Sequence, residues 1–577
     1  MVIHMHFFKS KPDEGQALLK GNVTFTGLSN LPKPFRKPEK KDIELDVFLQ
    51  RLKKLSQYSI RQMDEASLIV ANLNRFNFKA EQRQIIIEEL VRFIYPTIAA
   101  IYEKYQSKHN SLPESEGRRQ SLSSAIELVT QFSNTYKLSV TGFLNKDGKV
   151  TAKQAKNCHY AAFRSLELIL ITQRLRALRY QKLSRESWVD LNQLFFILAR
   201  HKLITEKYPM FGTIGINNRN HNNNNPYQQS VQYLYISLQI FGVLDVSTWP
   251  THLFHVPDSY LESLDTGVEF LTGDHQNLPE GFLYAWEDQN TPAIFQQPDI
   301  IKKQLVIIDY TRYYNSIIKD FEVIGEMSFI NKFDEKRLSR PIAKVNDEDR
   351  VPLLQNILTS LRQRERKSRR HVVFQDNKVT VYFGLADIIS LFRNEANSEI
   401  RKRLHSRELR DTIGALTDNS MPYQHNPLSA QWELVNFSAG GILISSMEIN
   451  FGYSIHMGQL VAFKTDGQTG QLALGFVCRL NRPQDRLVEV GINRLSSYAE
   501  IVIIEGAGDT ELYIPALLIQ DNAGGWQVVI QPNHQVQPGM PLKLYRGNKT
   551  SPARMGDLLL SKKEFTLYEF RSPGLVL

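Results

Sequence analysis

Residues 432–444 read WELVNFSAGGILI, and this stretch decides the fold of the C-terminal part of the chain. On both sides of a Gly-Gly pair, apolar and polar residues tend to alternate along the chain. This pattern is typical of two antiparallel strands joined by a turn. Asn436 and Ser438 are two positions apart, so we expect their side chains on one face of the first strand. Phe437 is then expected to point into the core, and Gly440 and Gly441 to ease the bend where a side chain would not fit.

Strand candidates lie on both sides of this hairpin. They are KVTVYFG at 378–384, GQLVAFKT at 458–465, LALGFVCRL at 472–480 and DRLVEVGINRL at 485–495. Short strands at this spacing, with Gly, Asn and Asp at their ends, predict an antiparallel barrel or sandwich. A helix near 386–404 is expected between the first strand and the hairpin. Further strands between 499 and 570 predict a second, small β unit.

An arginine-rich run precedes the first of these strands. Residues 362–370 read RQRERKSRR, with Glu365 as the one acidic residue among five arginines and a lysine. Arg366 and Arg370 have RxxxR spacing, and Asn436, Ser438 and Gly441 form NxSxxG. Together, and in this order, the two motifs resemble the signatures of the PilZ family, whose members are bacterial receptors for cyclic di-GMP. The resemblance covers roughly residues 346–500.

The resemblance implies a β-barrel that binds cyclic di-GMP through Arg366, Arg370, Asn436, Ser438 and Gly441. Arg364, Arg369 and Gly440 are possible additional contacts. A guanidinium can form paired hydrogen bonds with guanine, pair with phosphate or stack on a purine, so arginine suits a compact dinucleotide that carries two phosphates. By the same resemblance the chain is an effector, expected to regulate motility, pili, biofilm formation or virulence, with cyclic di-GMP as its ligand and no cofactor.

Some alternatives remain open. Arg403 and Arg407 have the same spacing as Arg366 and Arg370, but we prefer the earlier pair because a strand follows it directly. A degenerate PilZ-like barrel that serves as a protein-interaction scaffold, without binding nucleotide, is the second hypothesis. Binding of nucleic acid ranks lower, because one short basic cluster differs from the extended basic face that such binding usually needs.

The rest of the chain is expected to be mainly helical. Apolar residues recur every three or four positions from Asp42 to about Tyr208, which predicts long packed helices in a bundle or solenoid, without a fixed-period repeat. The predicted domains are an N-terminal arm and Pro/Lys linker at 1–41, a helical domain at 42–345 with an Asn-rich loop near 217–225, the PilZ-like barrel at 346–500 with its inserted helix, and a C-terminal β domain at 501–577.

Composition excludes several classes of function. Cys158 and Cys478 are the two cysteines and have neither zinc-ligand nor CxxC spacing, so we expect no disulfide framework and no metal site. No apolar run is long enough to span a membrane, and no motif of a P-loop, zincin or serine hydrolase occurs. We therefore expect a cytoplasmic binding protein that is not an enzyme, with a protein partner for its helical region.

Overall fold

The protein is described here from a computed structural model. The structure describes residues 28–573 apart from 29–30, 39–43, 107–111, 145–149, 213, 215–227, 263–267, 272–281, 296–304, 331–333, 363–370, 373–376, 396–428, 452–453, 466–471, 507–512, 522, 533–535 and 547–548. It divides into a helical unit (1–109 and 115–364) and a barrel unit (110–114 and 365–577). The Asn-rich loop near 217–225 lies outside the described residues.

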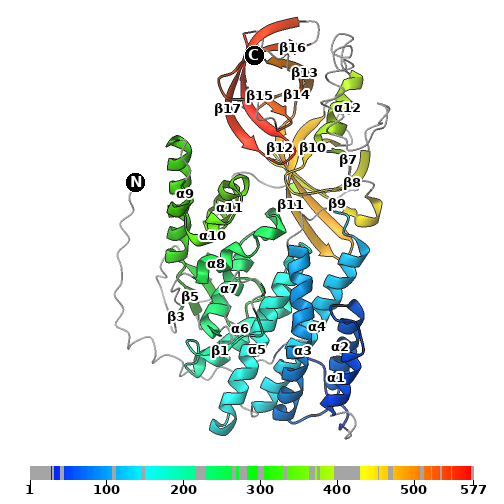
Figure 1. The fold of residues 1–577 in the computed structure, drawn as a ribbon, viewed down its shortest axis with the longest axis vertical. Helices are drawn as coiled ribbons and strands as arrows, with labels where there is room; N and C mark the ends of the chain where they lie inside the picture. The colour runs from blue at the N-terminus through cyan, green and yellow to red at the C-terminus, as the bar shows by residue number, and fades with distance from the viewer. Residues whose placement is uncertain are drawn as a thin grey trace. The chain divides into compact units, whose positions relative to one another are not determined.

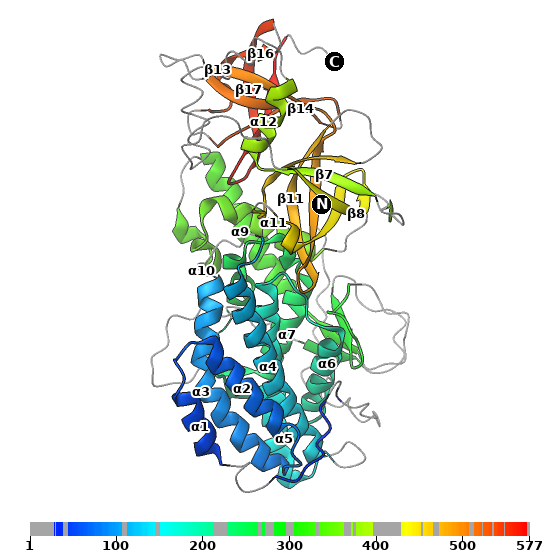
Figure 2. The same ribbon diagram turned by 90° about the vertical axis from the view of Figure 1, so that its right-hand side faces the viewer.

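The helical unit confirms the expectation of long packed helices. Its first six helices are α1 (Leu45–Lys53), α2 (Ile60–Leu73), α3 (Ala80–Gln106), α4 (Glu116–Phe143), α5 (Ala152–Ala177) and α6 (Arg185–Arg200). Helices α3, α4 and α5 lie side by side and bury apolar residues at helical spacing (Figures 1 and 2). The hydroxyls of Ser59, Ser115 and Ser184 cap three helix N-termini by accepting backbone N–H bonds, worth about 1 kcal/mol each.

The second half of the helical unit contains helices and short strands. It consists of β1 (Lys207–Pro209), β2 (Gln228–Ser230), α7 (Val231–Val243), α8 (Val256–Glu262), β3 (Val268–Leu271), β4 (Leu283–Trp286), β5 (Leu305–Ile308), α9 (Thr311–Ile330), α10 (Arg340–Ala343) and α11 (Asp347–Ser360). Strands β3, β5 and β4 form a small antiparallel sheet. Helix α11, assigned to the barrel domain from the sequence, lies in the helical unit.

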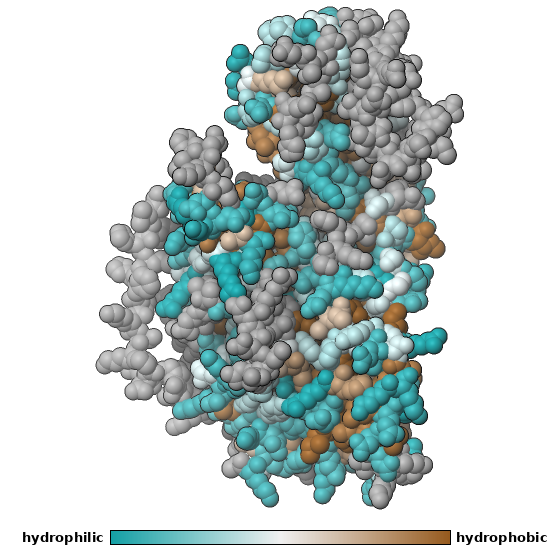
Figure 3. All heavy atoms as spheres, in the orientation of Figure 1, coloured by the Kyte–Doolittle hydropathy of each residue, from teal (hydrophilic) through white to brown (hydrophobic). Residues whose placement is uncertain are grey.

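The helical unit has a polar surface on the side that can be seen in Figure 3. Hydrophilic side chains cover much of its described surface there, with smaller apolar areas between them. Within the part of the chain that the structure describes, no helix combines the length and the apolar character required to cross a bilayer.

The barrel unit contains two six-stranded antiparallel barrels. The first barrel consists of β7 (Lys378–Phe383), β8 (Ser429–Ser438), β9 (Gly441–Met447), β10 (Leu460–Thr465), β11 (Ala473–Gln484) and β12 (Leu487–Ser496). Helix α12 (Leu385–Glu395) follows β7 at the predicted place, and β6 (His371–Val372) adds to β8. The second barrel consists of β13 (Ala499–Gly506), β14 (Tyr513–Gln520), β15 (Trp526–Ile530), β16 (Pro541–Arg546), β17 (Lys549–Ser561) and β18 (Thr566–Arg571). The predicted fold class is confirmed.

An ion pair joins the two barrels. His456 precedes β10, and its Nε2 lies 2.7 Å from the carboxylate of Glu564 in the β17–β18 connection. Burial lowers the pKa of His456, but the hydrogen bond and charge of Glu564 outweigh this, so the net pKa lies above the ordinary value. The pair therefore contributes stability that is complete below the unfolded-state pKa of about 6.5 and is lost as pH rises through the folded-state pKa.

We expect His456→Gln to lower the unfolding free energy of the barrel unit by up to about 1 kcal/mol at about pH 5.5 and by much less at about pH 8.5. Urea denaturation of the full chain at both pH values, read by a barrel tryptophan, measures this. Glu564→Gln should give the same pH dependence. An equal loss at both pH values would contradict the assignment.

Candidate functional site

The β8–β9 hairpin brings together the residues of the NxSxxG motif. Ser438 pairs with Gly441, and Ala439 and Gly440 form the turn between them. Asn436 pairs with Leu443, while Phe437 between them pairs with Ile442, a core residue that is 4% exposed. Asn436 and Ser438 therefore project from the outer face of the barrel, both partly exposed, where a ligand could reach them.

Phe437 corrects one expectation about this hairpin. The alternation placed its ring in the core, but the ring is 41% exposed. A one-residue bulge at Val435 shifts the register between Leu434 and Asn436, and Phe437 is followed by one strand residue before the exposed turn. Its side chain belongs to the inner face but lies where the strand ends, so burial is incomplete.

The structure explains why position 441 is a glycine, which the sequence did not reveal. A Cβ atom at this position would lie 2.1 Å from the carbonyl oxygen of Ile492 on β12, which is a fixed backbone atom. The glycine therefore permits the close approach of β9 to β12. At Gly440, by contrast, the nearest atom to an added Cβ would be Ser438 Oγ, 4.0 Å away.

We expect Gly441→Ala to destabilise the first barrel by about 1–3 kcal/mol, because β9 and β12 would have to separate. Gly440→Ala is the matched control and should change stability by less than about 0.5 kcal/mol. Thermal unfolding of both variants measures the difference. Equal effects of the two substitutions would show that strand packing does not explain Gly441.

The arginine run ends at the hairpin. Arg364, Arg366, Arg369 and Arg370 lie outside the described residues, as do Arg403 and Arg407. The residue that follows Arg370, His371, pairs with Phe437, and Val372 pairs with Asn436. In the chain, Arg370 therefore directly precedes a strand that pairs with the NxSxxG strand.

One further residue of this outer face was missed from the sequence. Leu443 pairs with Gly491, and Gly491 pairs with Arg479 on β11, so Asn436, Leu443, Gly491 and Arg479 form one cross-strand row. The arginine reaches this face because a register shift at Cys478 separates the Val477 and Arg479 pairs. A bulge of this kind reverses which side chains of the strand face outward. Nothing in the stretch LGFVCRL predicts the bulge.

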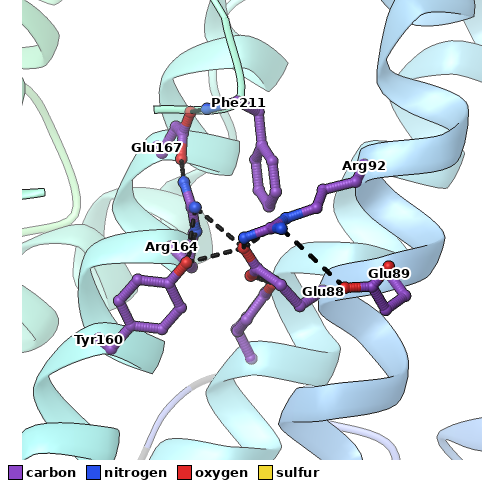
Figure 4. A network of polar contacts seen from close by, with 8 residues as sticks. Glu88, Glu89, Arg92, Tyr160, Arg164, Glu167 and Phe211 are labelled. Carbon is purple, nitrogen blue, oxygen red and sulfur yellow. Dashed lines mark hydrogen bonds and ion pairs between the residues drawn. The ribbon is translucent and has the colours of Figure 1, made fainter. Parts of the chain in front are cut away.

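The helical unit holds a buried charge network that could also be taken for a site. Arg164, whose side chain is 2% exposed, donates to Glu88 at 3.0 Å and to Glu167 at 2.6 Å (Figure 4). The hydroxyls of Tyr136 and Tyr160 also donate to Glu88, and the backbone N–H of Phe211 donates to Glu167. The network therefore connects α3, α4, α5 and the segment after β1.

The two carboxylates of this network differ in pKa. Burial raises the pKa of Glu88, but the charge of Arg164 and the two tyrosine hydroxyls outweigh it, so the net pKa is below the usual value. Glu167 is more deeply buried, and burial keeps its pKa above the usual value despite Arg164. Every charge has a partner, which is the pattern of a structural network.

Two hollows in the described part of the helical unit are lined by charged side chains. One of about 320 Å³ is lined by Glu81, Glu88 and Glu89 together with Gln84, Ile85, Asn157 and Tyr160. Another, of about 520 Å³, contains Arg350, but this guanidinium is already paired with Glu335 and Asp347. Glu88 in the first hollow is already paired with Arg164 and Arg92, as Arg350 in the second is with its two carboxylates.

No metal centre is apparent in the described ranges, where no group of three or more His, Cys, Asp and Glu side chains could hold an ion. Cys158 is buried, and burial raises the pKa of its thiol to about 12. Cys478 donates to the carbonyl of Gly491. Neither thiol is activated for chemistry by a neighbouring base in these contacts.

Comparison with known proteins gives one result, and it concerns the helical unit. The chain matches no curated protein and no solved structure. Residues 54–270, from the end of α1 into β3, match the family model described as the N-terminal domain of the cyclic-di-GMP receptor FimW.

Proposed function

We propose that this chain is a cyclic di-GMP receptor that binds its ligand on the outer face of the first barrel, as a PilZ-like domain. Two independent lines support this. The helical unit matches the N-terminal domain of a receptor for this nucleotide, and the barrel carries an RxxxR run followed by NxSxxG. The observation that carries the proposal is the pairing of β6 with β8, because β6 directly follows the arginine run in the chain and pairs with Asn436 and Phe437.

The roles of the residues follow from their chemistry. Asn436 and Ser438 offer an amide and a hydroxyl on the outer face, able to hydrogen-bond to base edges or phosphate oxygens. Arg366 and Arg370 would supply guanidinium groups for the guanines and phosphates, with Arg364 and Arg369 as further contacts. If ligand binding extends the β6–β8 ladder by one pair, Arg370 comes opposite Ser438. Gly441 and Gly440 shape the hairpin and contribute through the backbone.

In this proposal the protein makes or breaks no bond. It is a cytoplasmic receptor and effector in which bound nucleotide orders the arginine run and so changes the surface that a protein partner of the helical unit meets. The processes controlled would be those of PilZ effectors: motility, pili, biofilm formation or virulence.

A ligand-dependent thermal shift of the full chain tests this proposal. Cyclic di-GMP at about 100 times its Kd should stabilise the native state by about 2.7 kcal/mol, whereas GMP at the same concentration should give little shift. An unchanged melting temperature at millimolar cyclic di-GMP would favour the scaffold hypothesis instead. That alternative has support of its own, because the close packing of β9 on β12 explains Gly441 without a ligand.

A further inference from the structure

The two barrels connect their strands in the same way. If the six strands of each are numbered in chain order, the pairs in the first barrel are 1–2, 2–3, 3–6, 6–5, 5–4 and 4–1. The second barrel has the same six pairs. Six strands can close into an antiparallel barrel in several orders, so this agreement needs a cause.

The registers agree as well. Leu460 pairs with Phe476 at the start of strand four in the first barrel, and Pro541 pairs with Arg554 in the second. Strand five has three register shifts in the first barrel and two in the second, and one of them directly follows Val477 in β11 and Met555 in β17. These two residues pair with Ile492 and Phe570. Carrying the register across all six strands needs two offsets within strands. One is at the Val435 bulge, and the other follows Leu558, where β17 has a register shift that β11 lacks after Leu480.

A shared turn shows the correspondence in detail. Gly458 and Gly539 each stand two residues before strand four and have φ of +79° and +84°. The N–H of Gly458 donates to the carbonyl of Val477, and the N–H of Val477 donates to the carbonyl of Gln459. In the second barrel, Gly539 donates to Met555 and Met555 donates to Met540 in the same way. Both β-hairpins between strands two and three also end in Ala-Gly-Gly, at 439–441 and 523–525.

We infer that residues 499–571 are a second copy of the barrel at 378–496, and that in this copy the ligand face has become a docking face. The chain would then hold one nucleotide site, on the first barrel alone. The statement about the nucleotide rests on the proposed function, but the statement about docking does not.

The corresponding positions support the loss of binding. The register matches Asn436 with Ile519 and Ser438 with Asp521. It likewise matches Gly491 with Glu569. Asp557 follows Met555 by two residues, as Arg479 follows Val477. Three carboxylates thus stand where the first barrel has a hydroxyl, a glycine and an arginine, and they would repel phosphates.

In the hairpin of the second barrel, the carboxylate at the position of Ser438 is already hydrogen-bonded within the hairpin. The carboxylate of Asp521 accepts N–H bonds from Ala523 and Gly525 at 2.9 and 2.7 Å. Ser497 and Tyr498 alone separate β12 from β13, so the copy has no leading segment of its own that could carry an arginine run. Both features leave the copy without the parts that the proposed site uses.

The packing of the second barrel explains why it has an apolar residue, Ile519, where the first barrel has Asn436. Ile519 is fully buried in a cluster with Ile501, Ile503 and Leu517 on the outer face of the second barrel. The same cluster contains Leu385, Ile388 and Ile389 of α12 and Leu460, Ala462 and Leu474 of the first barrel. The face that corresponds to the ligand face therefore packs against α12 and the first barrel.

Hydrogen exchange of the full chain tests the docking. Ile519→Asn, which restores the residue type of the first barrel, should accelerate amide exchange in α12 at least about tenfold, because its packing surface becomes polar. Leu558→Asn is the matched control: it lies in the same barrel, is 48% exposed, and should leave α12 unchanged. Should Ile519→Asn not fold, Ile519→Ala provides a milder change. Unchanged α12 exchange in a folded Ile519 variant, or equal acceleration by Leu558→Asn, would overturn the docking.

Calorimetric titration with cyclic di-GMP tests the single site. One class of sites is expected, and Asn436→Ile with Ser438→Asp, which gives the first barrel the residues of the copy, should abolish all binding. Residual binding that disappears with Asp521→Ala would overturn the inference. Absence of binding to the unmodified chain would instead contradict the proposed function, and the exchange result for α12 would still decide the docking.

Discussion

Arg370→Ala is expected to weaken binding of cyclic di-GMP by at least about a hundredfold, or roughly 3 kcal/mol, without unfolding the chain. Arg370 directly precedes His371 in the chain, and His371 pairs with Phe437, the residue between Asn436 and Ser438. A charge-assisted hydrogen bond to guanine or phosphate from a position next to a paired strand contributes more than one from a distant segment. Calorimetric titration of the full chain measures the loss.

Arg407→Ala is the matched control for this experiment. Arg403 and Arg407 have the same RxxxR spacing as Arg366 and Arg370, but they come long after β6, the strand that ties the arginine run to β8. The control should keep the affinity within about a factor of three, which is less than 1 kcal/mol. A large loss in Arg407→Ala with unchanged affinity in Arg370→Ala would assign the site to the later pair.

Arg164→Ala is expected to destabilise the helical unit by about 3–5 kcal/mol. The side chain is 2% exposed, and its loss would leave Glu88 and Glu167 buried without their shared cation. Removing one partner from a buried charge network costs this much because the remaining charges are not solvated. Urea denaturation followed by circular dichroism at 222 nm, where helices dominate, measures the change.

Arg92→Ala offers a control that involves the same carboxylate. Arg92 also donates to Glu88, at 3.2 Å, but its side chain is 58% exposed. An exposed ion pair of this kind contributes less than about 1 kcal/mol. Similar losses for the two variants would mean that burial does not set the strength of the network. Neither variant should alter the affinity for cyclic di-GMP by more than about twofold.

The sequence was sufficient to predict the elements that follow from local pattern. Helical periodicity located α1 to α6, and the Gly-Gly pair at 440–441 located the β8–β9 turn, because both are set by residues close together in the chain. The helix inserted after β7 was also predicted, and α12 occupies 385–395. The part of that prediction from 396 to 404 lies outside the described residues.

Features that depend on contacts between residues far apart in the chain could not be predicted from the sequence. Position 441 must be a glycine because a carbonyl on β12 leaves no room for a side chain. Phe437 is partly exposed because it lies close to the end of β8. Arg164 and Glu88 are 76 positions apart and carry no motif. The duplication of the barrel was hidden because pairing and register persist while most side chains change, leaving Ala-Gly-Gly as the visible trace at both hairpins.

In the proposed function, cyclic di-GMP binds to the first barrel at the β8–β9 hairpin. Hydrogen exchange of the full chain with and without saturating cyclic di-GMP tests it most directly, because it reports every segment at once. We predict protection of 364–372 and 436–443, and no change in the corresponding hairpin of the second barrel at 519–527. Protection confined to the helical unit, or to 519–527, would contradict the claim.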